Sequence, residues 1–423
     1  MPVTRRTFLG TAGASLITRN LLRADDDPEV RVAVIGAGAR GSDLIRALTT
    51  VDGVELAGVC DDYPPHLEQG AKYAGPKTKT FANYRRLLDE LKPQAVAIAV
   101  PLHAHYQIAS DCLSAGCDVF LEKTMCYTIA EARQLAAQVA ASQRVFQVGL
   151  QRRANPIYKQ AQAMIASGMI GQVTSIKAQW HRNNSWRRPV PVPKTDPGWL
   201  ELERRLNWRL YKAFSGGLMA ELGSHQLDVV NWFLGAAPKR VFASGGIDFY
   251  RDGREVLDNI CCLYEYEVAP PKRDAGARPH TVRVSYTSLC NNAYEGAAEL
   301  IMGTQGSLYL TSAKGLLFQE KGADAVAWEG GKNAAEANAA VVTAGKTLKL
   351  SNDPWAHRGT PFEIDIEAGN DTRDQLVSFI DHVRRRELKT IADAAVGLND
   401  CATILIANQS VEAGGWVDFP KLA

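Results

Sequence analysis

The sequence lacks the features that mark membrane proteins, disulfide scaffolds and zinc proteins. No apolar run reaches ~18 residues without a charge, so we expect no membrane span. The eight cysteines include no CxxC pair, and most stand among apolar residues. That pattern favours buried free thiols over a disulfide scaffold or a zinc site.

The sequence also lacks a large excess of charge. The formal net charge is +2, from 48 basic and 46 acidic residues. Four of the basic residues lie in residues 1–24, which contain no acid, so the remaining chain has 44 basic against 46 acidic residues, or −2. This excludes the electrostatic footprint of a nucleic-acid binder. The 423 residues, 46% hydrophobic, suit a globular protein of two or three domains.

The N-terminal residues have the pattern of an export signal. Thr4–Gly10 contains the pair Arg5-Arg6 followed by Phe-Leu, and a mildly apolar stretch runs on to Leu22. We interpret residues 1–24 as a twin-arginine signal, which predicts a periplasmic or otherwise exported protein. An ordinary basic N-terminus is the alternative. Since little free dinucleotide is available outside the inner membrane, an exported enzyme is expected to hold its cofactor tightly and recycle it.

A glycine-rich turn follows the first predicted strand. Val30–Ile35 is β-branched and apolar, and Gly36-Ala-Gly38-Ala-Arg-Gly41 comes directly after it. In a dinucleotide-binding turn, Gly36 permits the tight bend, Gly38 lets the backbone approach the pyrophosphate, and Gly41 lets helix and strand pack closely. The pyrophosphate would lie at the N-terminus of the following helix, which favours anions.

The second predicted strand, Val54–Cys60, ends at Asp61, twenty residues after Gly41. A carboxylate there accepts hydrogen bonds from the ribose hydroxyls of an adenosine. No Lys or Arg adjoins it in Asp61–Pro64, so a 2′-phosphate would be repelled, and we expect NAD rather than NADP. A solvated acid at a strand end is the alternative interpretation.

The alternation of strands and helices continues to residue 149 and predicts an α/β domain with a parallel sheet. Ligands bind beyond the carboxyl ends of such strands. Four segments fall at those ends: Gly36–Gly41, Pro101–His105, Glu122–Thr124 and Leu150–Arg153.

Two of these segments carry ionisable side chains. Lys123 at a strand end beside a nicotinamide would hydrogen-bond the reacting hydroxyl and stabilise its developing negative charge. The alternative is a surface ion pair of Glu122 with Lys123. His103 and His105 alternate on one loop, but no carboxylate or third histidine lies at ligand spacing, so we expect no metal site.

With these motifs the chain resembles the Gfo/Idh/MocA oxidoreductase family from about Val30 to Phe419. Glu122-Lys123-Thr124 stands where the family has Glu-Lys-Pro, and Ala99–His105 is similar to its loop over the nicotinamide. Val148–Arg153 looks like its crossover into the second domain, and Gly216–Asp228 like its substrate-site motif.

The resemblance implies that His225 is the general base for a sugar hydroxyl and that Glu221 positions it. Their i, i+4 spacing places both on one helix face. A histidine that only packs in the core is the alternative. The implied cofactor-binding residues are Gly36, Gly38, Arg40, Gly41, Asp61, Pro101, His105, Glu122, Lys123 and Gln151.

The second half is expected to bind the substrate. A helix over 155–167 and a strand over 173–180 precede the polar, aromatic-rich loop His181–Arg188, and Asn207–Arg209 follows. Such residues stack on and hydrogen-bond a sugar ring. Packing in a core or an interface is the alternative role for Trp186 and Trp208. The predicted substrate-binding residues are Arg152, His181, Trp208, Arg209 and Asp228.

Strands in succession after residue 240 predict an α+β domain with a large, mostly antiparallel open sheet. We divide the chain into the signal (1–24), a Rossmann domain (28–150) and this substrate and oligomerisation domain (151–423). The resemblance implies a homodimer or homotetramer formed through the open sheet face. Residues 312–360 are weakly patterned and are interpreted as an insertion with little chemistry.

Three functions remain open from the sequence. The first is an NAD-dependent oxidoreductase acting on a sugar, polyol or glycoside hydroxyl with a recycled cofactor. The second is an NAD-dependent glycoside hydrolase that uses transient oxidation, elimination and re-reduction. The third is a non-catalytic binding protein, against which the presence of Lys123 and His225 argues.

Overall fold

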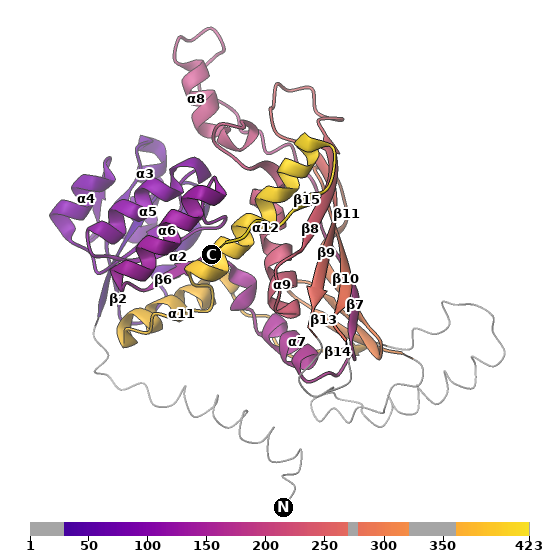
Figure 1. The fold of residues 1–423 in the computed structure, drawn as a ribbon. Helices are drawn as coiled ribbons and strands as arrows, with labels where there is room; N and C mark the ends of the chain where they lie inside the picture. Colours follow the sequence, from indigo (N-terminus) through magenta and orange to yellow (C-terminus); the bar gives the residue numbers. More distant parts are fainter. Residues whose placement is uncertain (1–28, 270–277, 321–360, 423) are drawn as a thin grey trace, which may run out of the picture.

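The computed structural model describes residues 29–269, 278–320 and 361–422, and contains two sheets with helices packed against them (Figure 1). The predicted export signal at residues 1–24 lies outside the described residues, as do residues 321–360 of the predicted insertion. Among the helices of the described ranges, none combines the length and apolarity needed to cross a membrane.

The first sheet is the parallel sheet that the sequence predicts. Its six strands pair in the order β3-β2-β1-β4-β5-β6, and every pairing is parallel. The chain therefore changes direction across the sheet between β1 and β4, the point where such sheets bind ligands. The strands are β1 (Val30–Ile35), β2 (Val54–Cys60), β3 (Lys79–Phe81), β4 (Ala95–Ile98), β5 (Asp118–Leu121) and β6 (Phe146–Val148).

Helices cover both faces of this sheet, which explains why its strands are almost continuously apolar. Val32 and Val34 are fully buried on one face, and Ala33 and Ile35 are buried on the other. The connecting helices are α2 (Ala39–Leu48), α3 (Pro64–Ala74), α4 (Tyr84–Leu91), α5 (His105–Ser114) and α6 (Ile129–Ser142).

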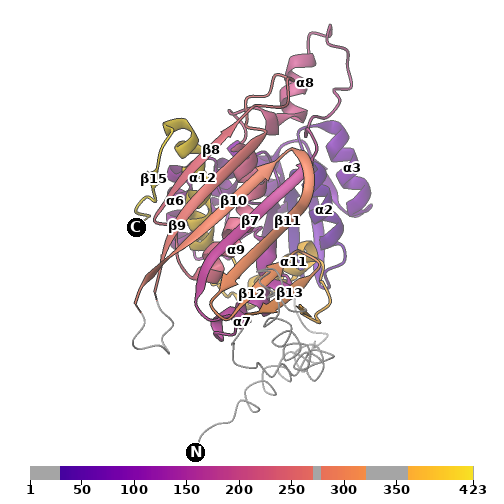
Figure 2. The same ribbon diagram turned by 90° about the vertical axis from the view of Figure 1, so that its right-hand side faces the viewer.

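The second sheet has nine strands in the order β14-β13-β12-β11-β7-β10-β9-β8-β15. All pairings are antiparallel except that of β7 with β10, which confirms the predicted mostly antiparallel sheet. Figure 2 looks onto the open face, with the helices behind. The strands are β7 (Val173–Asn183), β8 (Arg240–Gly246), β9 (Asn259–Val268), β10 (His280–Leu289), β11 (Asn291–Gly303), β12 (Gly306–Leu310), β13 (Gly315–Gln319), β14 (Phe362–Glu363) and β15 (Val417–Asp418).

The last two long helices, α11 (Asp371–Arg385) and α12 (Ala394–Ala413), join the two halves of the molecule. α11 packs against α2, and its Phe379 contacts Phe120 of β5 at a ring-centroid distance of 5.8 Å. α12 contributes Cys401 to the Rossmann core and Ile404 to the core of the second sheet. The chain crosses from the first half to the second near residue 150. Near its C-terminal end, α11 and α12 again contact the Rossmann half, and α12 contacts both halves. The helices after residue 150 are α7 (Pro156–Ala166), α8 (Trp199–Leu206), α9 (Ser224–Leu234), α11 (Asp371–Arg385) and α12 (Ala394–Ala413).

One strand continues beyond the end predicted from the sequence. β7 was expected to stop at Trp180, before a loop, but it runs to Asn183 because Arg182 and Asn183 pair with the start of β11. Polar residues in this stretch give no alternating apolar pattern, so only the pairing partner reveals the strand. Consequently residues 180–182 alternate between the two faces of the sheet.

Candidate active site

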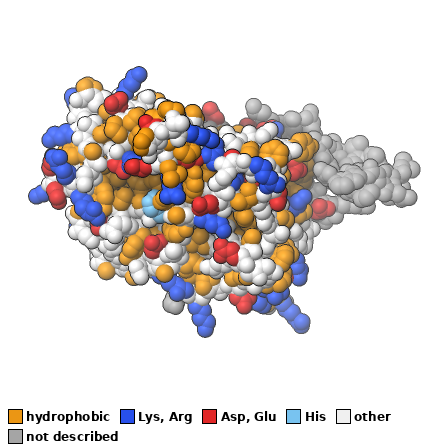
Figure 3. Space-filling model, turned by 90° about the horizontal axis from the view of Figure 1, so that it is seen from above, with side chains coloured by type: hydrophobic (Ala, Val, Ile, Leu, Met, Phe, Trp, Pro, Cys, Tyr) orange, Lys and Arg blue, Asp and Glu red, His pale blue; other side chains and the backbone are white. Residues whose placement is uncertain are grey.

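A cleft of about 1330 Å³ lies between the carboxyl ends of the Rossmann strands and the second half. Seen from the side of α8, the surface is hollowed there, with basic and acidic side chains around an apolar lining (Figure 3). All the predicted cofactor-binding residues except Gly41 line this cleft, as do Lys123, Glu221 and His225.

The glycine turn has the geometry that a dinucleotide needs. Gly36 has φ +92°, and a Cβ on Gly41 would stand 1.8 Å from the Gly36 carbonyl oxygen. A Cβ on Gly38 would meet only the His66 ring, at 3.6 Å, so the backbone there is open to the cleft. The N-terminus of α2 has no side-chain cap, which leaves its N–H groups available to an anion. These features fit the pyrophosphate of NAD.

Asp61 stands at the end of β2, at the adenosine end of the cleft. Its carboxylate accepts hydrogen bonds from the Ala37 and Tyr63 backbone N–H groups at 2.7 and 2.9 Å, and His66 Nδ1 lies 3.7 Å away. Burial raises the pKa of this carboxyl, but these interactions outweigh it and hold the pKa below its usual value. Asp61 is therefore an anion aimed at the ribose position.

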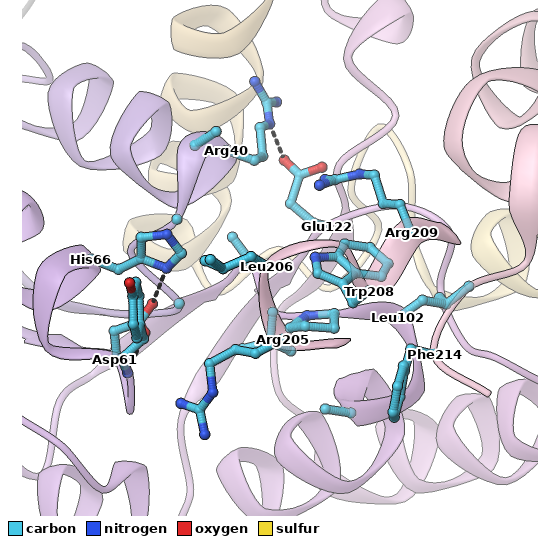
Figure 4. Close-up of a pocket in the computed structure, with 18 of the residues that line it drawn as sticks. Arg40, Asp61, His66, Leu102, Glu122, Arg205, Leu206, Trp208, Arg209 and Phe214 are labelled. Atoms are coloured by element: carbon cyan, nitrogen blue, oxygen red, sulfur yellow. Dashed lines mark hydrogen bonds and ion pairs between the residues drawn. The ribbon is translucent and has the colours of Figure 1, made fainter. Parts of the chain in front are cut away.

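A cationic side chain that the sequence analysis missed also lies at this end. Arg205 of α8 pairs with Asp62 at 3.1 Å, so a helix of the second half contacts the end of β2. Figure 4 shows Arg205 among the residues that line the same pocket as Asp61. Local sequence around Asp61 contains no basic residue, because the arginine comes from 143 positions further along the chain.

Glu122 and Arg40 form an ion pair at the centre of the cleft. Arg40 Nε donates to Glu122 at 2.7 Å, and the same guanidinium donates to Gln151 and to Thr372 of α11. A Cβ on Gly149 would stand 3.1 Å from the Glu122 carboxylate, so the glycine leaves room for it. The pair links the glycine turn, β5 and the crossover.

Lys123 places its ammonium group in the cleft. Its Nζ donates to the backbone carbonyls of Glu221 and Ala220 at 2.7 and 3.3 Å, and the Lys123–Thr124 peptide bond is cis. Burial lowers the pKa of Lys123, which the carboxylates of Glu221 and Glu122 only partly offset. One carbonyl pair therefore aims the ammonium across the boundary between the two halves.

His225 lies at the start of α9, 8% exposed, with its ring 5.2 Å from that of Trp180. Burial lowers the pKa of His225 well below its ordinary value, and the positive charges of Lys123, Arg152 and Arg40 lower it further. The imidazole is therefore neutral at neutral pH and able to accept a proton.

Glu221 does not pair with His225 as the sequence predicts. Its carboxylate binds Arg209 Nε at 2.8 Å, and the pKa of Glu221 is lowered because Arg209 and Lys123 outweigh the effect of burial. The reason is local: Met219–Gly223 forms a π-helical turn, so the i, i+4 spacing of an α-helix does not apply. Glu221 positions Arg209 instead.

His105 is buried and held by two backbone carbonyls, Thr124 O at 2.9 Å from Nδ1 and Val100 O at 3.0 Å from Nε2. It thus braces the loops after β4 and β5, and burial lowers its pKa. No group of three or more His, Cys, Asp or Glu side chains capable of holding a metal occurs in the part of the chain that the structure describes.

Three predicted substrate-binding residues lie outside the cleft, and the structure corrects those assignments. Arg152 is buried and pairs with Asp371 at 3.2 Å. Asp228, 1% exposed, receives the guanidinium of Arg153 at 2.8 Å. Both sit where the crossover meets α9 and α11, so their role in the structure is to join elements.

His181 is the third. Because residues alternate along β7, His181 points away from the cleft, where Tyr294 O and Thr287 Oγ1 bind its two nitrogens at 2.9 Å each. Its neighbours Trp180 and Arg182 line the cleft instead, and sequence reasoning missed both. Extending β7 to Asn183 would have identified them, because Trp180 and Arg182 lie on one face of the strand and His181 on the other. Trp208 and Arg209 line the cleft as predicted, with the guanidinium 4.3 Å from the indole centroid.

Two family profiles match the chain. The one described as "Oxidoreductase family, NAD-binding Rossmann fold" covers residues 30–150, and the "GFO/IDH/MocA C-terminal domain" covers residues 158–309. The N-terminal half is therefore an NAD-binding Rossmann domain.

Similar proteins include inositol dehydrogenases. Inositol 2-dehydrogenase of Salmonella paratyphi B is 28% identical over 214 residues, 50% of this chain and 56% of that protein. Inositol 2-dehydrogenase 1 of Saccharopolyspora erythraea is 33% identical over 156 residues, 36% of this chain and 46% of that protein. The chain thus spans about half the length of these curated relatives.

Solved structures share the fold across both halves. Levoglucosan dehydrogenase in complex with NADH has a TM-score of 0.69 at 16% identity, covering 93% of this chain and 100% of that chain. Myo-inositol 2-dehydrogenase from Lactobacillus plantarum has a TM-score of 0.66 at 16% identity, covering 93% and 100%. At these identities the likeness establishes the fold alone.

Proposed function

The chain belongs to the Gfo/Idh/MocA oxidoreductase family, and from that premise we propose that it oxidises a hydroxyl group of a sugar or polyol by hydride transfer to NAD. The observation that carries the proposal is one cleft that contains a dinucleotide-binding turn, a partly buried ammonium and a neutral imidazole. The bound nicotinamide supplies the hydride acceptor.

The protein's own groups handle the proton and the developing charge. His225, neutral because its pKa is lowered, removes the proton from the substrate hydroxyl. Lys123, held by the Glu221 and Ala220 carbonyls, donates a hydrogen bond to the same oxygen and stabilises its negative charge. Trp208, with Arg209 stacked on it, offers an apolar surface to the ring of the substrate.

We further propose that the cofactor is retained between turnovers. α8 reaches from the second half to the adenosine end of the cleft, where its Arg205 pairs with Asp62 and where Arg205 and Leu206 line the cleft together with His66. A dinucleotide seated on the glycine turn would leave only after this helix moves. Retention suits the twin-arginine export proposed from residues 1–24, since the cofactor would be loaded before export.

Assembly into a homodimer or homotetramer through the open face of the nine-stranded sheet is proposed as well. That face exposes large apolar side chains, Leu263 on β9 and Phe242 on β8, at 36% and 39% exposure. Isolated apolar residues are ordinary on surfaces, so sedimentation of the purified protein is needed to measure its size.

The test begins with the purified full chain. Dinucleotide absorbance that survives extensive dialysis is expected, and incubation with a panel of sugars and polyols should then produce bound NADH. His225→Asn is expected to lower kcat/KM by about 10²- to 10⁴-fold, the usual contribution of a general base, while the dinucleotide stays bound.

The controls separate the alternatives. Free sugar released from a glycoside without net NADH would identify the hydrolase instead. A protein that purifies without dinucleotide and binds none would overturn the oxidoreductase proposal. Full activity in His225→Asn would remove the histidine from the mechanism but leave the reaction standing.

A further inference from the structure

The charged side chains of the cleft are balanced at one end and unbalanced at the other. At the adenosine end, Asp62 pairs with Arg205, and at the centre Glu122 pairs with Arg40. A further group of four cations that line the cleft is gathered around Arg209, whose charge acts on the other three, and among the described residues Glu221 is the one carboxylate that forms an ion pair with a member of this group. The four cations are Lys123, Arg182, Arg188 and Arg209.

The one carboxylate is already engaged. Glu221 binds Arg209 at 2.8 Å, and its backbone carbonyl accepts from Lys123. Among the described residues, neither Arg182 nor Arg188 has a carboxylate within ion-pair distance, and no side-chain hydrogen bond is made by either guanidinium. The pKa values of both arginines are lowered, first by burial, and the nearby charge of Arg209 lowers them further. Two cations are thus partly desolvated without an ion-pair partner among the described residues, and the more distant charge of Glu221 offsets the effect on Arg182 only in part.

Arg182 is held in place by an aromatic ring. Its Cζ lies 4.8 Å from the centroid of Trp186, and its Nε is buried without a hydrogen-bond partner. Trp186 itself has φ +61°, a left-handed conformation that is rare for a bulky residue. Backbone conformations of this kind gather at ligand sites, where the surrounding structure imposes them.

Arg188 is positioned through its backbone. Asn207, 1% exposed, accepts from the Arg188 N–H at 2.6 Å and donates to the Arg188 carbonyl at 3.1 Å. Asn207 is anchored in turn by the buried carboxylate of Glu203, 2.6 Å from its amide nitrogen. The guanidinium is therefore presented to the cleft from a fixed main chain.

We propose that the substrate carries an anionic group, a carboxylate or a phosphate, which Arg182 and Arg188 bind. The inference rests on the proposed function, because it names the class of sugar or polyol that enters the same site. The two N–H groups of each guanidinium match the geometry of a carboxylate or a phosphate. The ligand then supplies the negative charge that no side chain of the described residues provides. Trp186 and Trp208 then contact the ring, with the anionic group beyond the reacting hydroxyl.

The experiment measures binding rather than turnover. The full chain is loaded with NADH, so that no hydride can leave an oxidisable sugar, and titrated calorimetrically with glucuronate, galacturonate, glucose 6-phosphate, glucose and galactose. An anionic sugar is expected to bind at least about tenfold more tightly than its neutral counterpart, with an affinity that falls as salt rises. The uronates and the phosphate distinguish the two sources of the charge.

The variants assign the effect to the two arginines. Arg182→Gln and Arg188→Gln are each expected to weaken binding of the anionic sugar by about 10- to 100-fold and to leave neutral sugars within about threefold. Lys177→Gln is the matched control, because Lys177 stands on the same strand, is exposed, and lies outside the cleft. It should change neither affinity.

Two results would overturn the inference. If neutral sugars bind as tightly as anionic ones, the substrate class is wrong, whereas the proposed oxidoreductase function stands. If no sugar of either kind binds the NADH-loaded protein, the inference falls together with the proposed function. The comparison of wild-type affinities decides the matter even if an arginine variant fails to fold.

Discussion

The two ends of the cleft differ in whether their charged side chains have partners within the protein. At the cofactor end, the carboxylates have partners within the protein: Asp61 accepts backbone N–H groups and Asp62 pairs with Arg205. The anionic pyrophosphate there is left to backbone donors of the glycine turn and α2. At the substrate end, Arg182 and Arg188 face the cleft without a counter-charge. The carboxylates of the first end are therefore paired within the protein, whereas in our proposal the second end obtains its negative charge from the substrate.

The two ends also differ in how they are assembled. The cofactor end comes mainly from one βαβ unit, so its residues are near neighbours in sequence. The substrate end is built from β7, the Trp208–Leu210 turn and the π-helical turn Met219–Gly223. Changes at each end should therefore have separable effects on cofactor and on substrate.

The largest expected effect lies where the ends meet. Lys123→Met removes the ammonium that two backbone carbonyls aim into the cleft, and we expect kcat to fall by about 10³-fold, because one preorganised donor contributes about that much. Single-turnover kinetics on the dinucleotide-loaded protein measure it.

Lys177→Met supplies the control for this variant, since it removes the same charge from an exposed position on β7. A Lys123→Met protein that keeps its cofactor and reacts at the wild-type rate would show that the ammonium takes no part in the chemistry.

The next effect is confined to the cofactor end. Asp61→Ala is expected to raise the Kd for NAD by about 10- to 100-fold, because charged hydrogen bonds to the ribose are lost. The ratio of the affinities for NAD and NADP is expected to fall. Arg205 remains nearby to accept a 2′-phosphate. Fluorescence titration with both cofactors measures the change.

Asp61→Asn refines this result because it retains an acceptor for the Ala37 N–H while removing the charge. Equal losses of NAD and NADP affinity in both variants would mean that Asp61 supports the turn and does not read the ribose.

The smallest effect concerns pH. His225 must be neutral, and its pKa lies well below 6.5, so the acid limb of kcat/KM should lie well below pH 6.5. Lys123 must be charged, and its pKa lies below 10.5, so the alkaline limb should appear below pH 10.5. Because the unfolded chain binds the histidine proton near pH 6.5 and the native state resists it, native stability should also fall as pH drops below 6.5.

Arg209→Gln tests which group sets the alkaline limb. Arg209 lowers the pKa of Lys123, so its removal should move that limb upward, while the acid limb stays because Arg209 is not among the charges acting on His225. An unmoved alkaline limb would assign it to another group.

Local motifs were predictable, and contacts between distant segments were not. Gly36, Gly38 and Asp61 follow from spacing within one βαβ unit, and the structure places all three on the cleft. By contrast His181 was chosen where Arg182 lines the cleft, because the end of β7 is polar and its pairing with β11 sets the parity. The partners of Asp228 and Arg152 lie 75 and 219 positions away along the chain, beyond the reach of local pattern.

The sequence by itself determined the Rossmann half, its glycine turn and the class of its cofactor, because apolar periodicity and close backbone approach are properties of neighbouring residues. Only the tertiary structure decided which side chains meet across the cleft. Glu221 pairs with Arg209 and not with His225, and Arg205 of α8 pairs with Asp62. Arg182 and Arg188 have no ion-pair partner among the described residues. Pairing of charges depends on the distance between side chains. For residues far apart in the sequence, that distance is set by how the sheets and helices pack.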